Sequence, residues 1–257
     1  MKVHVLASGS SGNALVVEGR EGALLFDCGL GPRVLASCLR QVNVEATTVK
    51  GLILSHEHSD HVKGLWKFRE RFSVPIWGTE GTWRALGGIF DEGAICASGR
   101  PLQTSGFTVQ PVATVHDAAE PTAFLVEENG VRLGILTDTG KVTELLFERL
   151  AGCHILLLES NHDLDMLRYG PYPAALKQRI ASSYGHLSNE QAREALERLV
   201  HPDLQYVVAM HLSQENNAPG LVQKELMQVL AGSSVQLAVA SARGGITLVV
   251  REDDDEG

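Results

Sequence analysis

The chain has 257 residues and a net charge of −9 at pH 7, with 44% hydrophobic and 21% charged residues. This length allows one large or two small domains, and the composition excludes a wholly disordered chain. Acidic residues outnumber basic ones by 31 to 22, which excludes a generally basic nucleic-acid-binding surface but not a local basic patch.

The amino-terminal half is expected to alternate short strands with helices. Apolar runs separated by Gly and Ser predict strands at Val3–Ala7, Ala14–Glu18 and Ala23–Phe26. A helix is expected at Pro32–Val42, where apolar residues recur on one face. Further along, the patterns predict a strand at Gly51–Leu54, helices near Val62–Phe72 and Thr79–Leu86, and strands near Phe107–Thr114, Thr122–Glu127 and Val131–Thr137.

The carboxyl-terminal half repeats this mixture. Its expected elements are a helix near Val142–Leu150, a strand at Ile155–Leu158, an irregular stretch to Tyr184, a helix to Val200 that opens with a Ser188–Gln191 capping box, a strand at Tyr206–Met210, a helix at Gly220–Leu230, and strands at Val235–Ala240 and Ile246–Val250. Strand runs interrupted by helices predict an α/β (α+β) fold of two packed sheets with helices outside, as one domain over residues 1–250. Residues 251–257 carry five acidic side chains and are expected to form a disordered tail.

Cysteine usage and hydropathy suggest the compartment. The four cysteines are scattered, with neither metal-ligand spacing nor a disulfide pattern. The amino terminus lacks the long apolar core of a signal peptide, and no run of 18 apolar residues occurs. We therefore expect a cytoplasmic protein without a membrane partner.

The most informative segment is Ser55-His56-Glu57-His58-Ser59-Asp60-His61, directly after the strand Gly51–Leu54. Alternate side chains of an extended backbone share a face, so His56 and His58 can bind one ion. Asp60 and His61 lie where the chain turns into a helix and can reach a neighbouring position. Imidazole and carboxylate suit Zn²⁺, and also Mn²⁺ or Fe²⁺. Because this clustering is rare by chance, it predicts a metal site and not a polar connector.

This segment resembles the His-x-His-x-Asp-His signature of the metallo-β-lactamase superfamily. The resemblance extends over nearly the whole chain through VLASGSSGNA, LSHEHSDHVKGL, VHDAAEPTAF, LTDTG, LESNHD and GHLSNEQA. Together these segments are similar to the YycJ/WalJ group of bacterial metallo-hydrolases, which is closer to the nuclease and phosphodiesterase branches than to the antibiotic hydrolases. The resemblance implies a four-layer αββα sandwich, which agrees with the elements predicted above.

The resemblance also implies a binuclear centre that holds two divalent ions per chain, zinc or manganese with iron as a third option. The implied ligands are His56, His58 and His116 for one ion, Asp60, His61 and His211 for the other, and Asp138 between them. Taken alone, His116, Asp138 and His211 are ambiguous, although each follows a predicted strand, where loops gather functional groups. Such a centre activates a bridging hydroxide, and we expect Asp60 to act in catalysis as well as in binding.

Other residues are candidates for substrate contact or for positioning the ligands. His186, before a predicted helix start, is a catalytic candidate, either as a general acid or as a phosphate contact; its alternative is simple packing beside the capping box. Substrate contacts are expected from Ser10 and Asn13 of the Gly/Ser loop, which otherwise is a plain hairpin turn, and from His162. By resemblance, Asp27 and Asp117 are expected to orient the ligands, although Asp117 also competes with His116 as a ligand.

The expected function is a metal-dependent phosphodiester hydrolase, and the group resemblance implies a DNA 5′-to-3′ exonuclease. The alternatives are a small cyclic-nucleotide phosphodiesterase, a lactonase or thioesterase, and a metal-stabilised regulatory module without activity. The net charge weakens the DNA interpretation, but basic groups follow the metal-binding segment and occur again in the irregular stretch: Lys63, Lys67, Arg69, Arg71, Lys177 and Arg179. The expected partners are a phosphodiester, above all DNA, and a second copy of the chain as a homodimer.

Overall fold

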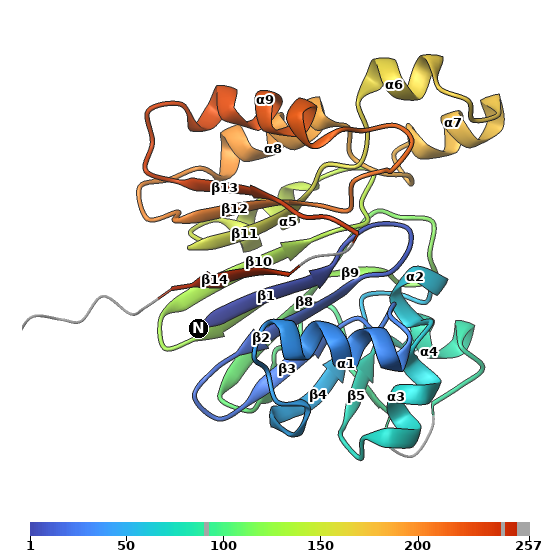
Figure 1. Ribbon diagram of the computed structural model, residues 1–257, viewed down its shortest axis with the longest axis vertical. Helices are drawn as coiled ribbons and strands as arrows, with labels where there is room; N and C mark the ends of the chain where they lie inside the picture. The colour runs from blue at the N-terminus through green and yellow to red at the C-terminus, as the bar shows by residue number, and fades with distance from the viewer. Residues whose placement is uncertain (90–92, 243–244, 251–257) are drawn as a thin grey trace, which may run out of the picture.

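Two facing sheets form the centre of this computed structural model, which describes residues 1–89, 93–242 and 245–250 (Figure 1). The predicted acidic tail at 251–257 lies outside the described residues. The first sheet has seven strands in the order β14-β1-β2-β3-β4-β5-β6. These strands are β1 (Lys2–Ala7), β2 (Ala14–Glu18), β3 (Ala23–Phe26), β4 (Val49–Ile53), β5 (Ile76–Gly78), β6 (Gly93–Ile95) and β14 (Ile246–Val249).

The second sheet also has seven strands, in the order β13-β12-β11-β10-β9-β8-β7. These are β7 (Leu102–Thr104), β8 (Phe107–Ala113), β9 (Thr122–Glu128), β10 (Val131–Leu136), β11 (Ile155–Glu159), β12 (Tyr206–Met210) and β13 (Gln236–Val239). An apolar core fills the space between the sheets, where the rings of Phe26 and Phe124 lie 5.3 Å apart. Burial of such large side chains from both sheets is a principal source of stability.

Helices cover the outer face of each sheet, as Figure 1 shows. The first sheet carries α1 (Pro32–Gln41), the 3₁₀ turn η1 (Ala46–Thr48), α2 (Ser59–Val62), α3 (Leu65–Arg71) and α4 (Glu80–Ala85). On the side of the second sheet lie α5 (Glu144–Leu150), α6 (Leu164–Tyr169), α7 (Ala174–Ile180), α8 (Asn189–Leu199) and α9 (Pro219–Leu230). The resulting four-layer αββα sandwich confirms the fold class predicted from the sequence.

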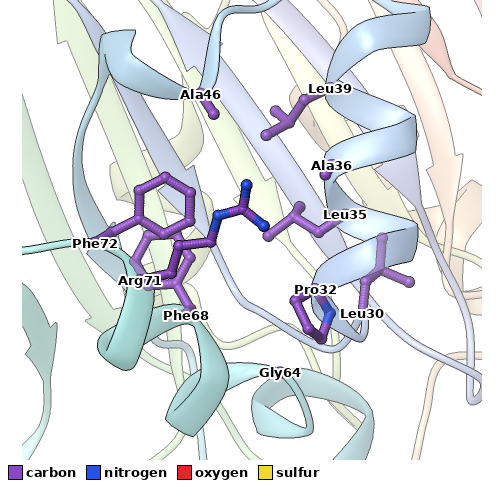
Figure 2. A pocket seen from close by; sticks show the side chains of 10 residues that line it. All are labelled: Leu30, Pro32, Leu35, Ala36, Leu39, Ala46, Gly64, Phe68, Arg71 and Phe72. Carbon is purple, nitrogen blue, oxygen red and sulfur yellow. The ribbon is translucent and has the colours of Figure 1, made fainter.

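Helices α1 and α3 meet over the first sheet along an apolar seam. Figure 2 shows Leu35 and Leu39 of α1 facing Phe68 and Phe72, with the side chain of Arg71 across the gap. The cavity left between them has a volume of about 30 Å³, which is room for about one water molecule. The seam is therefore a packing contact and not a ligand site.

The structure differs from the sequence expectation in two regions. The helix expected at Val62–Phe72 is two helices, because α2 ends at Val62 and Gly64 sits before α3. A side chain at Gly64 would meet the Leu30 carbonyl oxygen at 2.0 Å, so this tight crossing requires glycine. The stretch expected to be irregular contains α6 and α7, which are too short for a clear helical periodicity.

Candidate metal centre

The sequence candidates converge at one edge of the sandwich because the relevant strands all end there. The ladders give β1, β3 and β4 the same direction in the first sheet, and β8, β10, β11 and β12 the same direction in the second. The residues at or just beyond these carboxyl ends are Ser8, Asp27, His56, His116, Asp138, Glu159 and His211. Two sheets thus bring segments distant in sequence to one site.

A first histidine group comprises His56, His58 and His116, whose ligand atoms all lie within 4.8 Å of one another. His116 Nδ1 lies 2.9 Å from the Gly185 carbonyl oxygen, and His58 Nε2 lies 3.2 Å from the Asp117 carbonyl oxygen. Since a carbonyl oxygen only accepts, these contacts fix the protonated nitrogen of each ring. The opposite nitrogens, His116 Nε2 and His58 Nδ1, face each other at 3.3 Å.

A second group comprises Asp60, His61 and His211. Asp60 Oδ2 lies 3.5 Å from His61 Nε2 and 3.4 Å from His211 Nε2. Asn13 joins this group, because its side-chain amide donates to Asp60 Oδ2 at 3.1 Å and lies 3.0 Å from His61 Nε2. Both histidines are buried, so their ring nitrogens are shielded from bulk water.

Asp138 lies between the two groups. One oxygen is 3.2 Å from His61 Nε2, and the other is 3.2 Å from His211 Nδ1 and 3.9 Å from His116 Nε2. A carboxylate in this position reaches ligands of both groups at once.

Buried negative charge dominates the electrostatics. Burial alone would raise the pKa of Asp60, but hydrogen bonds from His211 and His61 hold it well below its usual value. Burial also disfavours the charged form of His211, which by itself would lower its pKa. The neighbouring Asp138, Asp60 and Glu159 instead raise the pKa of His211 to about 10. Positive charge is thus favoured at His211, whereas burial lowers the pKa values of His56 and His116 in the first group.

Asp27 and Ser55 form hydrogen bonds that orient the histidines of the metal-binding segment. Asp27 Oδ2 accepts a hydrogen bond from His61 Nδ1 at 2.7 Å. The backbone amide of Ser55 donates to Asp27 Oδ1 at 2.8 Å, and the Ser55 hydroxyl contacts Asp27, His56 Nδ1 and His61 Nδ1 within 3.2 Å. Asp27 thus occupies the orienting position that the resemblance implies.

Glu159 is a site residue that sequence reasoning missed. Its side chain is 0% exposed, and it accepts from His186 Nδ1 at 2.7 Å, His211 Nδ1 at 3.1 Å, and the amides of Thr139 and Leu187 at 2.9 and 3.2 Å. Burial raises the pKa of Glu159, but its neighbours, His186 first, bring it down to about 2. The signal in the sequence was an acidic residue that ends an otherwise apolar strand.

Ser8 is a second missed residue, since its hydroxyl accepts from the His211 amide at 2.7 Å. This contact joins residues 203 positions apart, which no local pattern could reveal.

His186 faces both groups. Its ring centroid lies 4.9 Å from that of His116 and 5.1 Å from that of His211. Nδ1 contacts Glu159 and 19% of the side chain is exposed, while Nε2, on the side away from Glu159, has no hydrogen bond to another described residue.

The remaining candidates fall in different places. Ser10 is exposed at the tip of the loop, whereas Asn13 is buried against Asp60. Asp117 Oδ1 lies 3.3 Å from His116 Nε2 and its other oxygen pairs with Arg179, beside the first group. His162 is 1% exposed, and burial lowers its pKa to about 4; its contact with a substrate stays a prediction.

The donor set fits divalent metal ions. His56 Nε2 is buried and has no hydrogen-bond partner among the described residues, a costly arrangement unless another group satisfies it. Imidazole nitrogens and carboxylate oxygens are the donors that Zn²⁺ and Mn²⁺ accept. A cation at each group would satisfy the orphaned nitrogen and offset the buried carboxylates.

Comparisons with known proteins agree with this fold and site. Residues 23–212 match the family described as the β-lactamase superfamily domain. The chain is 36% identical to exodeoxyribonuclease YycJ of Bacillus anthracis over 231 residues, or 88% of each chain. It is 31% identical to exodeoxyribonuclease WalJ of Streptococcus pneumoniae serotype 2 over 93% of this chain and 91% of that one. The metallo-β-lactamase fold protein YhfI of Bacillus subtilis, at 18% identity, superposes with a TM-score of 0.72 and covers 96% of this chain and 98% of that chain.

Proposed function

The chain belongs to the metallo-β-lactamase superfamily, and from this premise we propose that it is a DNA exonuclease that degrades DNA from 5′ to 3′. A metal hydrolase related to the YycJ and WalJ exodeoxyribonucleases is the coarser description. The observation that carries the proposal is His186, an oriented imidazole beside two adjoining ligand groups. This arrangement suits an ester whose leaving group needs a proton.

The proposed ligands are those that the resemblance implies, in two groups bridged by Asp138: His56, His58 and His116, then Asp60, His61 and His211. When bound, two divalent ions lower the pKa of a water and stabilise charge on the phosphate oxygens. Zinc or manganese fits these donors, with iron as a third option.

The chain itself positions the ligands and moves a proton. Asp27 holds the protonated Nδ1 of His61, so that Nε2 is free to bind an ion. Glu159 accepts a hydrogen bond from His186 Nδ1 and so orients the ring with Nε2 on its opposite side. His186 Nε2 then donates its proton to the sugar oxygen that leaves the phosphorus.

Two accompanying proposals concern compartment and assembly. The four cysteines are free thiols, which supports a reducing cytoplasm. No helix among the described residues is long and apolar enough to cross a membrane. A homodimer stays a prediction.

The experiment compares linear duplex DNA labelled at the 5′ or the 3′ end with closed circular DNA, each with Mn²⁺ or Zn²⁺. We expect mononucleotides from the 5′-labelled end first and no cleavage of the circle, because an exonuclease needs an end. Hydrolysis of a cyclic mononucleotide or a lactone without release from DNA would instead support the corresponding alternative. Digestion of the circle would refute the requirement for an end.

A further inference from the structure

A groove next to the metal centre is outside the machinery described so far. It has a volume of about 640 Å³ and runs between helix α1 and the loop that follows β1. Its polar and charged lining side chains are Ser11, Arg33, Ser37, Cys38, Gln41 and Lys63. Among the described residues that line it, none is acidic, although the chain as a whole carries −9.

The groove adjoins the segments that carry the second ligand group. Gly29 lies in its wall, and a Cβ atom there would meet the Asp60 carbonyl oxygen at 1.7 Å and the Asn13 amide nitrogen at 2.5 Å. Lys63 follows His61 by two residues. The groove wall at Gly29 and Lys63 therefore lies directly beside the segments that hold Asn13, Asp60 and His61.

The two cations in the groove are available to a ligand. Arg33 and Lys63 are both exposed, and neither forms an ion pair with another described residue. Some other surface cations, by contrast, are paired, as Lys67 is with Glu70 and Arg84 with Glu80. Unpaired cations on one side of a groove attract a row of phosphates.

Helix α1 presents a second face to this groove. Arg33, Ser37 and Gln41, four residues apart, line the groove, whereas Leu35 and Leu39 pack in the seam of Figure 2. No side chain caps the amino terminus of the helix at Gly31, and its first turn holds no acidic residue. The amides of that turn therefore add to the positive potential that Arg33 supplies.

We propose that this groove binds the phosphate backbone of one DNA strand where it continues past the metal centre on the side of Asp60 and His61. The inference rests on the proposed function, because it needs DNA at the metal centre. The groove has the size of sites that enclose small molecules, so it takes a few nucleotides of a single strand and not a duplex. Arg33 and Lys63 contact phosphates and leave the bases unread, as expected for an enzyme that degrades any sequence.

Cys38 gives a direct test, because it lies in the groove while Cys28, Cys96 and Cys153 are buried. The rate of Cys38 alkylation by N-ethylmaleimide is measured with the metal-loaded protein, with and without an excess of a ten-residue oligothymidylate whose phosphorothioate linkages resist hydrolysis. We expect the oligonucleotide to slow alkylation at least tenfold at saturation. The Cys38→Ser variant identifies the modified residue, since it should take up no label under native conditions.

A double variant tests the cations. Arg33→Gln/Lys63→Gln should lower the salt dependence of oligothymidylate binding by about 1.4 in log K against log salt, since each lost phosphate contact on a single strand contributes about 0.7. The control is Arg100→Gln/Lys224→Gln, two exposed cations outside the groove, which should keep the wild-type slope. Binding is followed by fluorescence anisotropy, and metal content and Tm verify that both variants are folded.

The outcomes separate the groove from the proposed function. If the wild type degrades DNA ends but DNA leaves Cys38 alkylation and the salt slope of the groove variant unchanged, the groove is not the path of the strand and the exonuclease stands. If the wild type neither binds nor degrades DNA, both proposals are refuted.

Discussion

Replacement of His186 by alanine tests the proposed proton donor. The substitution removes an imidazole whose Nδ1 lies 2.7 Å from Glu159 Oε1 and whose ring lies about 5 Å from those of His116 and His211. It leaves all seven proposed metal ligands in place. Glu159 keeps three of its four hydrogen-bond partners, namely His211 and the amides of Thr139 and Leu187.

The expected effect depends on the leaving group. General acid catalysis contributes about 10²–10⁴-fold, so His186→Ala should lower kcat on DNA by that factor, because the departing sugar oxygen needs a proton. A nitrophenyl phosphodiester should lose far less, because nitrophenolate leaves without one. The lost hydrogen bond to a buried carboxylate costs about 1.5–3 kcal/mol of folding free energy, and solvent can reach the vacated place, since the His186 side chain is 19% exposed.

The assay measures kcat and KM for both substrates, with metal content per chain as the check on the site. His201→Ala is the matched control, because His201 bonds the Cys153 carbonyl before the start of β12, at the opposite edge of the sheet. Glu159→Gln should reproduce part of the loss, and combining it with His186→Ala should add little, since both act on one proton. Equal losses on the two substrates, mainly in KM, would indicate a phosphate contact; unchanged kinetics would leave His186 a packing residue.

Three further predictions address the ligands and the core. The Asp138→Asn substitution keeps the shape of the side chain, but the variant should bind fewer than two ions per chain by elemental analysis and lose nearly all turnover. A variant with full metal content and normal activity would show that Asp138 is no bridging ligand. Asp27→Asn should weaken metal affinity about 10–100-fold by loosening its hold on His61, measured by competition with a chromogenic chelator, and unchanged affinity would remove Asp27 from the site. Phe124 lies between the sheets and is 1% exposed, so Phe124→Ala should lower the free energy of unfolding, measured by urea titration, by about 3–5 kcal/mol. The control Leu145→Ala, at a position 43% exposed, should change this free energy little. Similar values for the two variants would contradict the assigned core.

The sequence predicts those parts of the fold that have a period or a sharp boundary. The strands Ala14–Glu18, Ala23–Phe26 and Tyr206–Met210 match β2, β3 and β12 residue for residue, because each is a short apolar run bounded by turn residues. The capping box at Ser188 and Gln191 opens α8 as expected. The three-residue strands β5, β6 and β7 were not predicted, because pairing with a neighbour and not local pattern makes them strands.

The same distinction applies to the site. The cluster from His56 to His61 is local and visible in the sequence, whereas His116, Asp138 and His211 needed the family resemblance. Glu159 was missed because an acidic residue at a strand end is ordinarily a solvent-exposed terminus; its burial follows from the packing of β11 between β10 and β12.

The backbone at three strand ends shows why these site residues are hard to derive from local rules. Asp27, Asp138 and His211 adopt positive φ angles of 58°, 53° and 56°, a region that costs side-chain-bearing residues about 1–2 kcal/mol each. Glycine would remove this cost, but it carries no ligand. A residue in the left-handed backbone conformation ends the regular alternation of side chains between the two faces of its strand. Side chains from both sheets can then turn toward one point. Hydrogen bonds hold the chain there, from the Asp27 amide to the Ile53 carbonyl oxygen and from the His211 amide to Ser8. The sum, about 3–6 kcal/mol, is large beside the usual stability of a domain. Strain on this scale at three converging side chains is explained by the site they form and not by the fold that carries it.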